Sequence, residues 1–349
     1  MTRYLRVRGP GTAHVKCGET RLFGIPLPED SKVVVPVGRT YIFQTETKDC
    51  IEPINTKVED DPLGKELYKI AEDIVEKVVG EGWKRVYILG YSDTGKSTIA
   101  TLVHNLMLSY HVSSSFVTID VGQNEVHMPT FTSLIAGKPV FPGTRCSKTI
   151  NCFVGSITPA DAPERYIGCT WFLLDHTHGK PVIIDTDGWV SGPGSLYAKR
   201  GIIGMSKNVL LVATRFPSRM EEYLSKLGYE ILKIRPLEIA SKSREERIIN
   251  RMRLVSNVFQ SAQHVTIYLD EILLVEPRRK PRTPGHRLWE GHIAATYRKG
   301  KLSGAMIIEK IDGIKGKLSG YIIGDRKFDL VEVGIARFPN VVKSLRSML

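Results

Sequence analysis

The sequence of 349 residues has no run of 18 or more apolar residues, so it predicts no transmembrane helix. It also lacks the charged and then apolar pattern of a signal peptide at its start, and we expect a soluble, cytoplasmic protein without a membrane partner. The few cysteines show no C-x-x-C spacing, so we predict neither a zinc site nor a disulfide framework. We interpret all five as small buried or neutral residues: Cys17, Cys50, Cys146, Cys152 and Cys169.

Acidic residues are fewer than basic ones, with 37 Asp and Glu against 49 Lys and Arg, which gives a formal net charge of +12. Such a balance favours a polyanionic partner without proving one. The segment from Glu276 to the end is especially basic, with 16 basic and 7 acidic residues. A solvated, charge-rich surface is the alternative interpretation. The densest part of this segment contains Arg278, Arg279, Lys280, Arg282 and Arg287.

The segment Gly90-Tyr-Ser-Asp-Thr-Gly-Lys-Ser97 fits the phosphate-binding loop G-x-x-x-x-G-K-[ST]. It follows a strand-like run and precedes a helical pattern, which is the order that this motif requires. In such a loop Lys96 reaches the β- and γ-phosphates and the Ser97 hydroxyl binds Mg²⁺. We therefore predict that the chain binds ATP or another nucleoside triphosphate. The expected contacts are Gly90, Ser92, Asp93, Thr94, Gly95, Lys96, Ser97 and Thr98.

The hydrophobic pattern predicts three domains in an α/β protein. Residues 1–58 alternate in short strand-like runs, and residues 59–275 form a P-loop NTPase core that begins with a helix over Leu63 to Val79. Residues 276–349 are a basic linker and a second small β domain. Within the core, helices separate apolar runs, which predicts a mostly parallel sheet covered on both faces. These runs are Tyr87 to Leu89, Phe116 to Ile119, Val182 to Ile184, Val209 to Ala213 and Ile231 to Ile234. We expect Met128 to Gly155, rich in Pro, Gly and Thr, to be an irregular insertion that forms a wall or lid of the site.

A carboxylate follows one of these predicted strands, at Asp120. At the carboxyl edge of an α/β sheet, Asp120 could hold Mg²⁺ through water or accept a proton from an attacking hydroxyl. The alternative is that the Asp120 side chain only caps a helix or loop. No [NT]-K-x-D element follows the phosphate loop, so a regulatory GTPase is not expected, and nothing indicates the second ATPase core of a helicase.

Several separated segments together resemble the polynucleotide 5′-hydroxyl kinase family, which includes the RNA kinases of tRNA splicing, pre-mRNA cleavage and ribosomal RNA processing, and the archaeal members in particular. The phosphate loop matches the family's form, and Asp120-Val-Gly-Gln123 matches its Asp-x-Gly-Gln magnesium strand. Thr186-Asp-Gly-Trp189 matches its T-x-G-W clasp. Ser243-Arg-Glu-Glu-Arg-Ile-Ile-Asn-Arg251 resembles its arginine-bearing lid helix, although Ile248 and Ile249 stand where relatives often have charged residues.

The resemblance implies a transfer of the γ-phosphate of ATP or another nucleoside triphosphate to the 5′-OH end of RNA, with DNA as a further acceptor to test. The implied catalytic residues are Lys96, Asp120, Arg247 and Arg251, with Ser97 and Asp120 at the metal. The implied substrate contacts are Gln123, Thr186, Gly188, Trp189 and Arg244. Two alternatives stay open: an ATP-binding scaffold that is catalytically silent, and a nucleic-acid-stimulated ATPase. The sequence names no protein partner.

Overall fold

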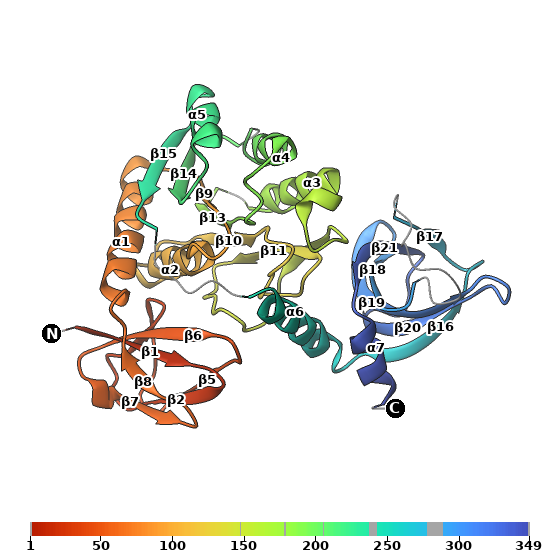
Figure 1. Cartoon of the computed structure of the whole chain (residues 1–349), viewed down its shortest axis with the longest axis horizontal. Coiled ribbons are helices and arrows are strands. Elements are labelled where there is room, and N and C mark those ends of the chain that lie inside the picture. The colour runs from red at the N-terminus through yellow and green to blue at the C-terminus, as the bar shows by residue number, and fades with distance from the viewer. Residues whose placement is uncertain are drawn as a thin grey trace.

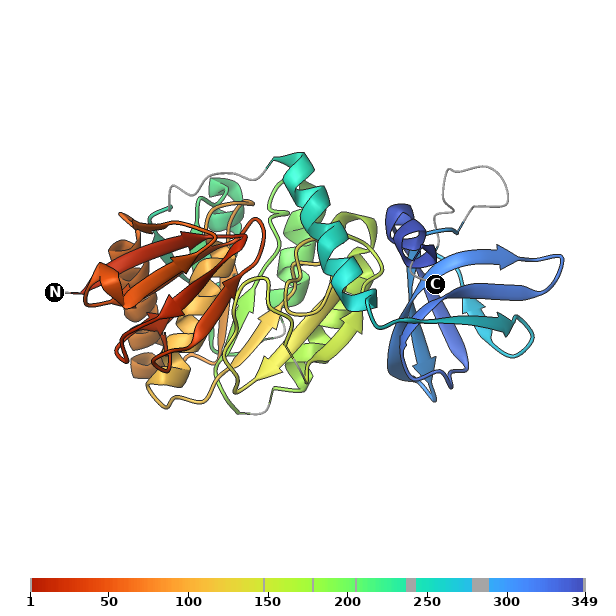
Figure 2. The same cartoon turned by 90° about the horizontal axis from the view of Figure 1, so that it is seen from below.

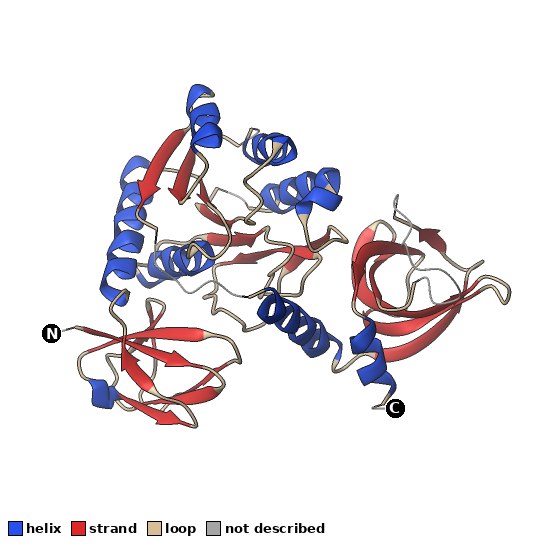
Figure 3. Ribbon diagram, in the orientation of Figure 1, coloured by secondary structure: helices blue, strands red, loops and turns tan. Residues whose placement is uncertain are grey.

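The computed structural model describes residues 2–146, 148–177, 179–204, 206–236, 243–277 and 289–347. A central α/β unit lies between an N-terminal and a C-terminal β unit (Figures 1 and 2). Figure 3 shows that helices are concentrated in the central unit and that strands dominate the two others. This is the predicted fold class. No helix within the described ranges is long and apolar enough to cross a membrane.

The central unit is built on a seven-stranded sheet with the order β12-β11-β10-β13-β9-β14-β15. The strands β10, β13, β9, β14 and β15 are parallel, whereas β11 runs antiparallel to β10 and to β12. All five predicted core strands are present. The bounds are β9 Arg85–Leu89, β10 Ser115–Thr118, β11 Phe131–Ala136, β12 Ile150–Phe153, β13 Val182–Asp185, β14 Val209–Thr214 and β15 Glu230–Ile234.

Helices cover both faces of this sheet because alternate residues of its strands point to opposite faces. On β9, Val86 and Ile88 pack in the core cluster that contains α1 and α2. The intervening Tyr87 and Leu89 pack in the cluster that contains α3, α4 and α5. The helix bounds are α1 Gly64–Glu81, α2 Lys96–Ser109, α3 Pro163–Asp175, α4 Pro193–Ile203 and α5 Ser218–Lys226, with a 3₁₀ turn η2 at Pro159–Asp161.

The segment Met128 to Gly155 is more regular than we expected. It contains β11 and β12, which extend the sheet beyond β10, so the prediction of an irregular insertion is wrong for these residues. The buried strand β11 carries Thr132 and Ser133, whose hydroxyl groups form hydrogen bonds within the sheet, and these polar residues interrupt the apolar pattern. The connection between the two strands still lines the candidate site, through Pro142.

The N-terminal unit contains a five-stranded sheet, β4-β3-β6-β1-β8, and a three-stranded sheet, β5-β2-β7. Its last strand, β8, extends to Asp60, two residues beyond the predicted boundary. The bounds are β1 Arg3–Arg8, β2 Gly11–Val15, β3 Arg21–Leu22, β4 Ile25–Pro26, β5 Lys32–Val35, β6 Thr40–Thr45, η1 Lys48–Cys50, β7 Ile51–Ile54 and β8 Val58–Asp60.

The C-terminal unit is a six-stranded sheet, β16-β20-β19-β18-β21-β17, with one helix, α7. Because β16 and β17 pair with β20 and β21, this unit begins at Gln263, and the predicted boundary at residue 276 is too late. The basic residues Arg278, Arg279, Lys280, Arg282 and Arg287 lie outside the described residues. The bounds are β16 Gln263–Tyr268, β17 Leu273–Val275, β18 His292–Arg298, β19 Lys301–Asp312, β20 Lys317–Gly324, β21 Leu330–Arg337 and α7 Pro339–Arg346.

The helix α6, Arg244–Phe259, connects the central and C-terminal units (Figure 2). Its second half buries Val255, Val258 and Phe259 in one cluster with residues of both units. A direct backbone contact joins the same units, since the amides of Ile335 and Ala336 donate to the Gly155 carbonyl oxygen at 2.6 and 3.1 Å. The C-terminal unit therefore anchors the end of α6 and leaves its first half beside the central sheet.

Two disulfides contradict our interpretation of the cysteines. Cys17 is bonded to Cys50 within the N-terminal unit, and Cys152 on β12 is bonded to Cys169 on α3. Cys146 is free. The expectation of no disulfide was wrong because it used only short-range spacing, whereas these pairs are 33 and 17 residues apart and are brought together by the fold.

Candidate active site

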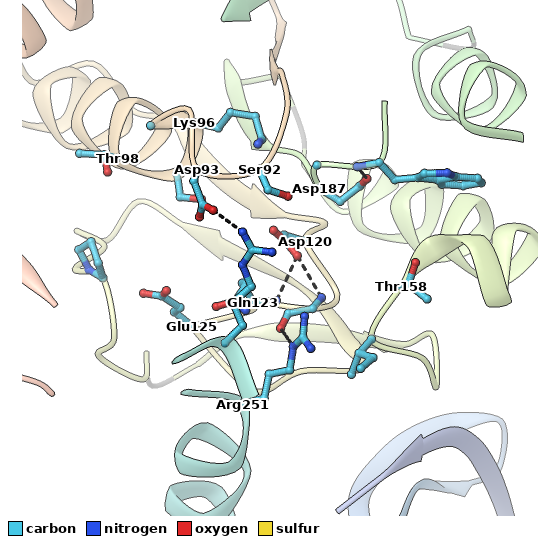
Figure 4. A pocket seen from close by; sticks show the side chains of 18 of the residues that line it. Ser92, Asp93, Lys96, Thr98, Asp120, Gln123, Glu125, Thr158, Asp187 and Arg251 are labelled. Carbon is cyan, nitrogen blue, oxygen red and sulfur yellow. Dashed lines mark hydrogen bonds and ion pairs between the residues drawn. The ribbon is translucent and has the colours of Figure 1, made fainter. Parts of the chain in front are cut away.

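The candidate site is a hollow of about 380 Å³ at the carboxyl ends of the central strands (Figure 4). The phosphate loop, the end of β10, the clasp after β13 and the first half of α6 all contribute to its walls. Ligands of α/β proteins bind at this edge because the loops that follow parallel strands meet there. The residues that line the hollow are Arg39, Ser92, Asp93, Gly95, Lys96, Ser97, Thr98, Asp120, Gly122, Gln123, Glu125, Pro142, Ile157, Thr158, Pro159, Asp187, Gly188, Trp189, Arg247 and Arg251.

The phosphate loop turns sharply between β9 and α2. Gly90 has a φ of 154°, and a Cβ atom there would collide with the Thr214 carbonyl oxygen at the end of β14. The Thr94 hydroxyl donates to the Tyr91 carbonyl oxygen at 2.9 Å, which closes the turn. Gly95 then precedes the first residue of α2, so the positive end of the helix faces the hollow. The local sequence thus builds the tight turn and the helix start that the phosphate-loop motif requires.

Lys96 lines the hollow, and its Nζ atom donates to the Tyr91 carbonyl oxygen at 2.6 Å. Burial lowers the pKa of Lys96, whereas the nearby carboxylates of Asp185, Asp120 and Asp187 oppose this shift. Three carboxyl groups around a buried lysine favour its charged form. It is therefore available to a phosphate group that enters the loop.

Asp120 follows β10 and is held by the loop that it begins. Its Oδ1 atom accepts hydrogen bonds from the amides of Gly122 and Gln123 at 3.0 and 3.1 Å (Figure 4). Burial raises the pKa of Asp120, and the charge of Asp187 raises it further, whereas Lys96 lowers it. A carboxylate with a raised pKa binds a proton more readily, which suits a group that accepts one.

Asp185, at the end of β13, is a second carboxylate that we did not predict. Burial raises its pKa to about 7, Asp120 contributes to the rise, and Lys96 and a hydrogen bond from the Ser97 side chain oppose it. Within the described part of the chain, its Oδ1 atom is buried without a hydrogen-bond partner. The sequence did carry a signal, because Asp185 directly follows the apolar run Val182 to Ile184, as Asp120 follows the run Phe116 to Ile119.

The donor set fits a divalent cation such as Mg²⁺. The Asp185 carboxylate, one oxygen of which has no partner among the described residues, lies beside the Ser97 side chain, and hard oxygen ligands are those that Mg²⁺ prefers. The described residues include no group of three or more His, Cys, Asp or Glu side chains that could hold a metal alone. A cation here would complete its ligand set with water and nucleotide phosphates, which is usual for Mg²⁺.

The clasp, Thr186 to Trp189, packs directly on the phosphate loop. A Cβ atom at Gly188 would lie 2.7 Å from the Ser92 amide nitrogen and would collide with the Ser92 Oγ atom, so only glycine fits. Thr186, the first residue of the clasp, is buried, and its hydroxyl donates to the Ile88 carbonyl oxygen of β9 at 2.7 Å. Gly188 and Trp189 line the hollow, whereas Thr186 does not.

Asp187 is the residue that holds the clasp in place, and no motif indicated its partners. Its Oδ1 atom accepts from the Trp189 amide at 2.6 Å. Its Oδ2 atom binds Lys199 of α4 at 2.6 Å and accepts a hydrogen bond from the Tyr166 hydroxyl of α3. The Lys199 side chain is fully buried. This network connects Asp187 of the clasp to α3 and α4, two helices on one face of the sheet.

The lid helix α6 begins with a capping box, in which Ser243 and Glu246 exchange hydrogen bonds with each other's backbone amides. Arg247 forms an ion pair with Asp93 of the phosphate loop, and Arg251 donates from its Nε atom to the Gly122 carbonyl oxygen at 3.0 Å (Figure 4). Because the two arginines are four residues apart, they lie on one face of α6, and both line the hollow. Asn250 donates to the Gln123 side chain at 3.0 Å.

The structure separates the predicted site residues into two groups. Most of them line one hollow, and their individual roles remain predictions. Four do not line it: Gly90 and Thr94 shape the loop from within, Thr186 is buried, and Arg244 is exposed. The N-terminal unit also reaches the site, because Arg39 lines the hollow and forms an ion pair with Glu125. The sequence alone could not place these two residues together.

The fold and the site define a P-loop nucleotide-binding protein with carboxylates and arginines placed for phosphoryl chemistry. The family described as "mRNA cleavage and polyadenylation factor CLP1 P-loop" matches residues 90–261. Together with the relatives below, this match shows that the chain is similar to the Clp1 and Grc3 polynucleotide kinases.

Two archaeal relatives are named polyribonucleotide 5′-hydroxyl-kinases. The protein of Pyrococcus furiosus is 27% identical over 262 residues, which cover 74% of this chain and 69% of that protein. The protein of Methanocaldococcus jannaschii is 28% identical over 202 residues, 54% of each chain. A solved structure of a Clp1p–Pcf11p complex matches 97% of this chain and 94% of its own, with a TM-score of 0.66 and 15% identity. At that identity the match concerns the fold.

Proposed function

We propose that this protein is a polynucleotide 5′-hydroxyl kinase that transfers the γ-phosphate of ATP, or of another nucleoside triphosphate, to the 5′-OH end of RNA. One observation carries the proposal: Lys96, Asp120 and the two lid arginines from three separate segments line one hollow. The names of the relatives support the same activity.

The donor nucleotide would bind with its phosphates along the loop and the start of α2. Lys96 would exchange its hydrogen bond to Tyr91 for the β- and γ-phosphates. Ser97 and Asp185 are the side chains beside which Mg²⁺ fits, with Asp120 as the further carboxylate of our sequence prediction. A bound Mg²⁺ neutralises charge on the phosphate oxygens.

The acceptor hydroxyl would lie beside Asp120. Two backbone amides fix the orientation of this carboxylate, and its raised pKa favours acceptance of the hydroxyl proton. Arg247 and Arg251 would stabilise the charge that spreads over the transferred phosphoryl group. To do so, Arg247 would exchange Asp93 for the phosphate, so the ion pair marks where the lid meets the loop.

The test is transfer of label from γ-³²P-ATP with Mg²⁺ to a short 5′-OH RNA, beside a matched DNA and a 5′-phosphorylated RNA. Label on the 5′-OH RNA and none on the phosphorylated control is the expected result, and the DNA lane gives the sugar preference. Tightly bound ATP without transfer would favour the scaffold, and free phosphate would favour an ATPase.

Two variants separate the catalytic groups from folding. Arg247→Ala should lower the rate of transfer by roughly 10³-fold or more, since arginines at a transferred phosphoryl group have effects of that size. Lys96→Ala should abolish transfer. The control is Ile249→Ala, because Ile249 is exposed on the same helix and does not line the hollow. Near-full activity of Arg247→Ala would contradict the role given to the lid.

A further inference from the structure

A second hollow of about 250 Å³ adjoins the candidate active site, between the lid helix and the C-terminal unit. Ile157 and Arg251 line both this second hollow and the main hollow. The remaining walls are Ile248 and Met252 of α6 and residues 337–340, which join β21 to α7. Only the meeting of two units forms this hollow, so no local sequence pattern could have indicated it.

The position of this second hollow places it on the acceptor side of the site. None of its lining residues belongs to the phosphate loop. The shared residues instead surround Gly122, two residues after Asp120: Arg251 donates to the Gly122 carbonyl oxygen, and a Cβ atom at Gly122 would lie 2.7 Å from the Ile157 carbonyl oxygen. A molecule that extends from the acceptor hydroxyl past Asp120 would therefore reach it.

The chemistry of the second hollow suits a nucleobase joined to a phosphodiester. Its walls are mainly apolar, with Phe338 and Pro339 on one side and Ile248 and Met252 on the other. Arg251 and Arg337 add positive charge. Its volume is below the roughly 300 to 1,000 Å³ of sites for drug-sized ligands, which limits its occupant to a smaller group such as a single base. Proteins bind single strands by such a combination of a stacking surface with basic residues.

We propose that this hollow binds the base of the second nucleotide of the acceptor, counted from the 5′-OH end, and so selects a polynucleotide over a free nucleoside. The proposal rests on the kinase activity proposed above. It assigns a function to Ile248, which is exposed on the lid helix although it is apolar. An apolar residue at this position contributes to a base-binding wall, whereas a charged one would not.

The experiment uses three short 5′-OH RNAs of one sequence: the intact strand, a strand without the second base, and a strand without a base near its 3′ end. We measure kcat/KM for each with the whole protein. Loss of the second base should lower kcat/KM by at least about 5-fold, since stacking of one base has an effect of roughly 5- to 150-fold. Loss of the distant base should have no effect.

The adjacent isoleucines supply a matched pair of variants. Ile248 lines the hollow, whereas Ile249 is 61% exposed and does not line it. Ile248→Ala should lower kcat/KM on the intact RNA and leave the strand without the second base unchanged, so the preference between these two RNAs falls toward one. Ile249→Ala should keep the wild-type preference. Because the readout is a ratio within one variant, a general loss of active protein would not imitate it.

The outcomes distinguish this proposal from the kinase activity itself. If the wild-type protein phosphorylates the intact RNA and the RNA without the second base equally well, the hollow does not bind that base. An equal effect of Ile248→Ala on both RNAs would also overturn the proposal. If even the intact RNA is not phosphorylated, the proposed activity fails, and the inference that rests on it fails with it.

Discussion

The ion pair between Asp187 and Lys199 gives a prediction whose size can be worked from the structure. The two side chains are 4% and 0% exposed, and their atoms are 2.6 Å apart. In Lys199→Met the carboxylate of Asp187 keeps its hydrogen bonds but loses the only cation bonded to it among the described residues. Removal of one partner from a buried pair costs about 3 to 5 kcal/mol. That is a large part of the roughly 5 to 15 kcal/mol that stabilises a typical protein.

The double variant Asp187→Asn with Lys199→Met should recover most of this loss. An asparagine can still accept from the Trp189 amide and donate to the Tyr166 oxygen, and methionine fills the space of the lysine chain without a charge. We therefore expect each single variant to be destabilised and the double variant to lie within about 1 kcal/mol of the wild type. Urea unfolding of the four proteins at pH 7 measures the coupling.

An exposed ion pair is the control for this cycle. Lys226 binds Glu222 at 2.6 Å on α5, but its side chain is 75% exposed, so Lys226→Met should cost less than about 1 kcal/mol. If Lys199→Met were as mild as Lys226→Met, or if the effects of the Asp187 and Lys199 substitutions simply added, the pair would not hold the clasp as argued.

Three further predictions concern the site and the core. Gly188→Ala should lower transfer activity by at least about 10²-fold and stability by about 1 to 3 kcal/mol, because the added Cβ displaces the clasp from Ser92; kcat, at a temperature where the variant is folded, and a thermal melt measure this. Asp185 has a pKa raised to about 7, so the folded protein binds the extra proton between pH 4 and 7 and loses stability as the pH rises through this range. Without Mg²⁺, the free energy of unfolding of the wild type should fall by up to about 4 kcal/mol more than that of Asp185→Asn when the pH rises from 4 to 8. Urea unfolding of both proteins at the two pH values measures this difference. Burial lowers the pKa of His104 to about 4, so the unfolded chain binds the extra proton and stability falls by up to about 3 kcal/mol as the pH falls from 6.5 to 4. His104→Gln should flatten this fall in the same assay.

Those features of the site that lie within one short segment could be predicted from the sequence. The phosphate loop is such a feature, because two glycines, a lysine and a serine at fixed spacing are sufficient to build it. The core strands were also recognisable, since parallel strands buried on both faces are continuous apolar runs. The strand β11 was missed because Thr132 and Ser133 are buried in it. Their hydroxyl groups bond to Cys152 and Asn151 of β12, a partner strand that the sequence does not reveal.

Other features that were missed depend on contacts between distant segments. Arg39 of the N-terminal unit meets Glu125, which follows β10, and Lys199 of α4 meets Asp187 after β13. Neither pair has a spacing that a motif could specify, since each depends on how a helix or a domain packs on the sheet. The lid is an intermediate case: the spacing of Arg247 and Arg251 gave their common face, but their position over the hollow depends on the C-terminal unit, which anchors the other end of α6. The chemistry of phosphate binding is therefore local in this chain. The hollow that we propose for an acceptor base, by contrast, exists only after the central and C-terminal units have packed together.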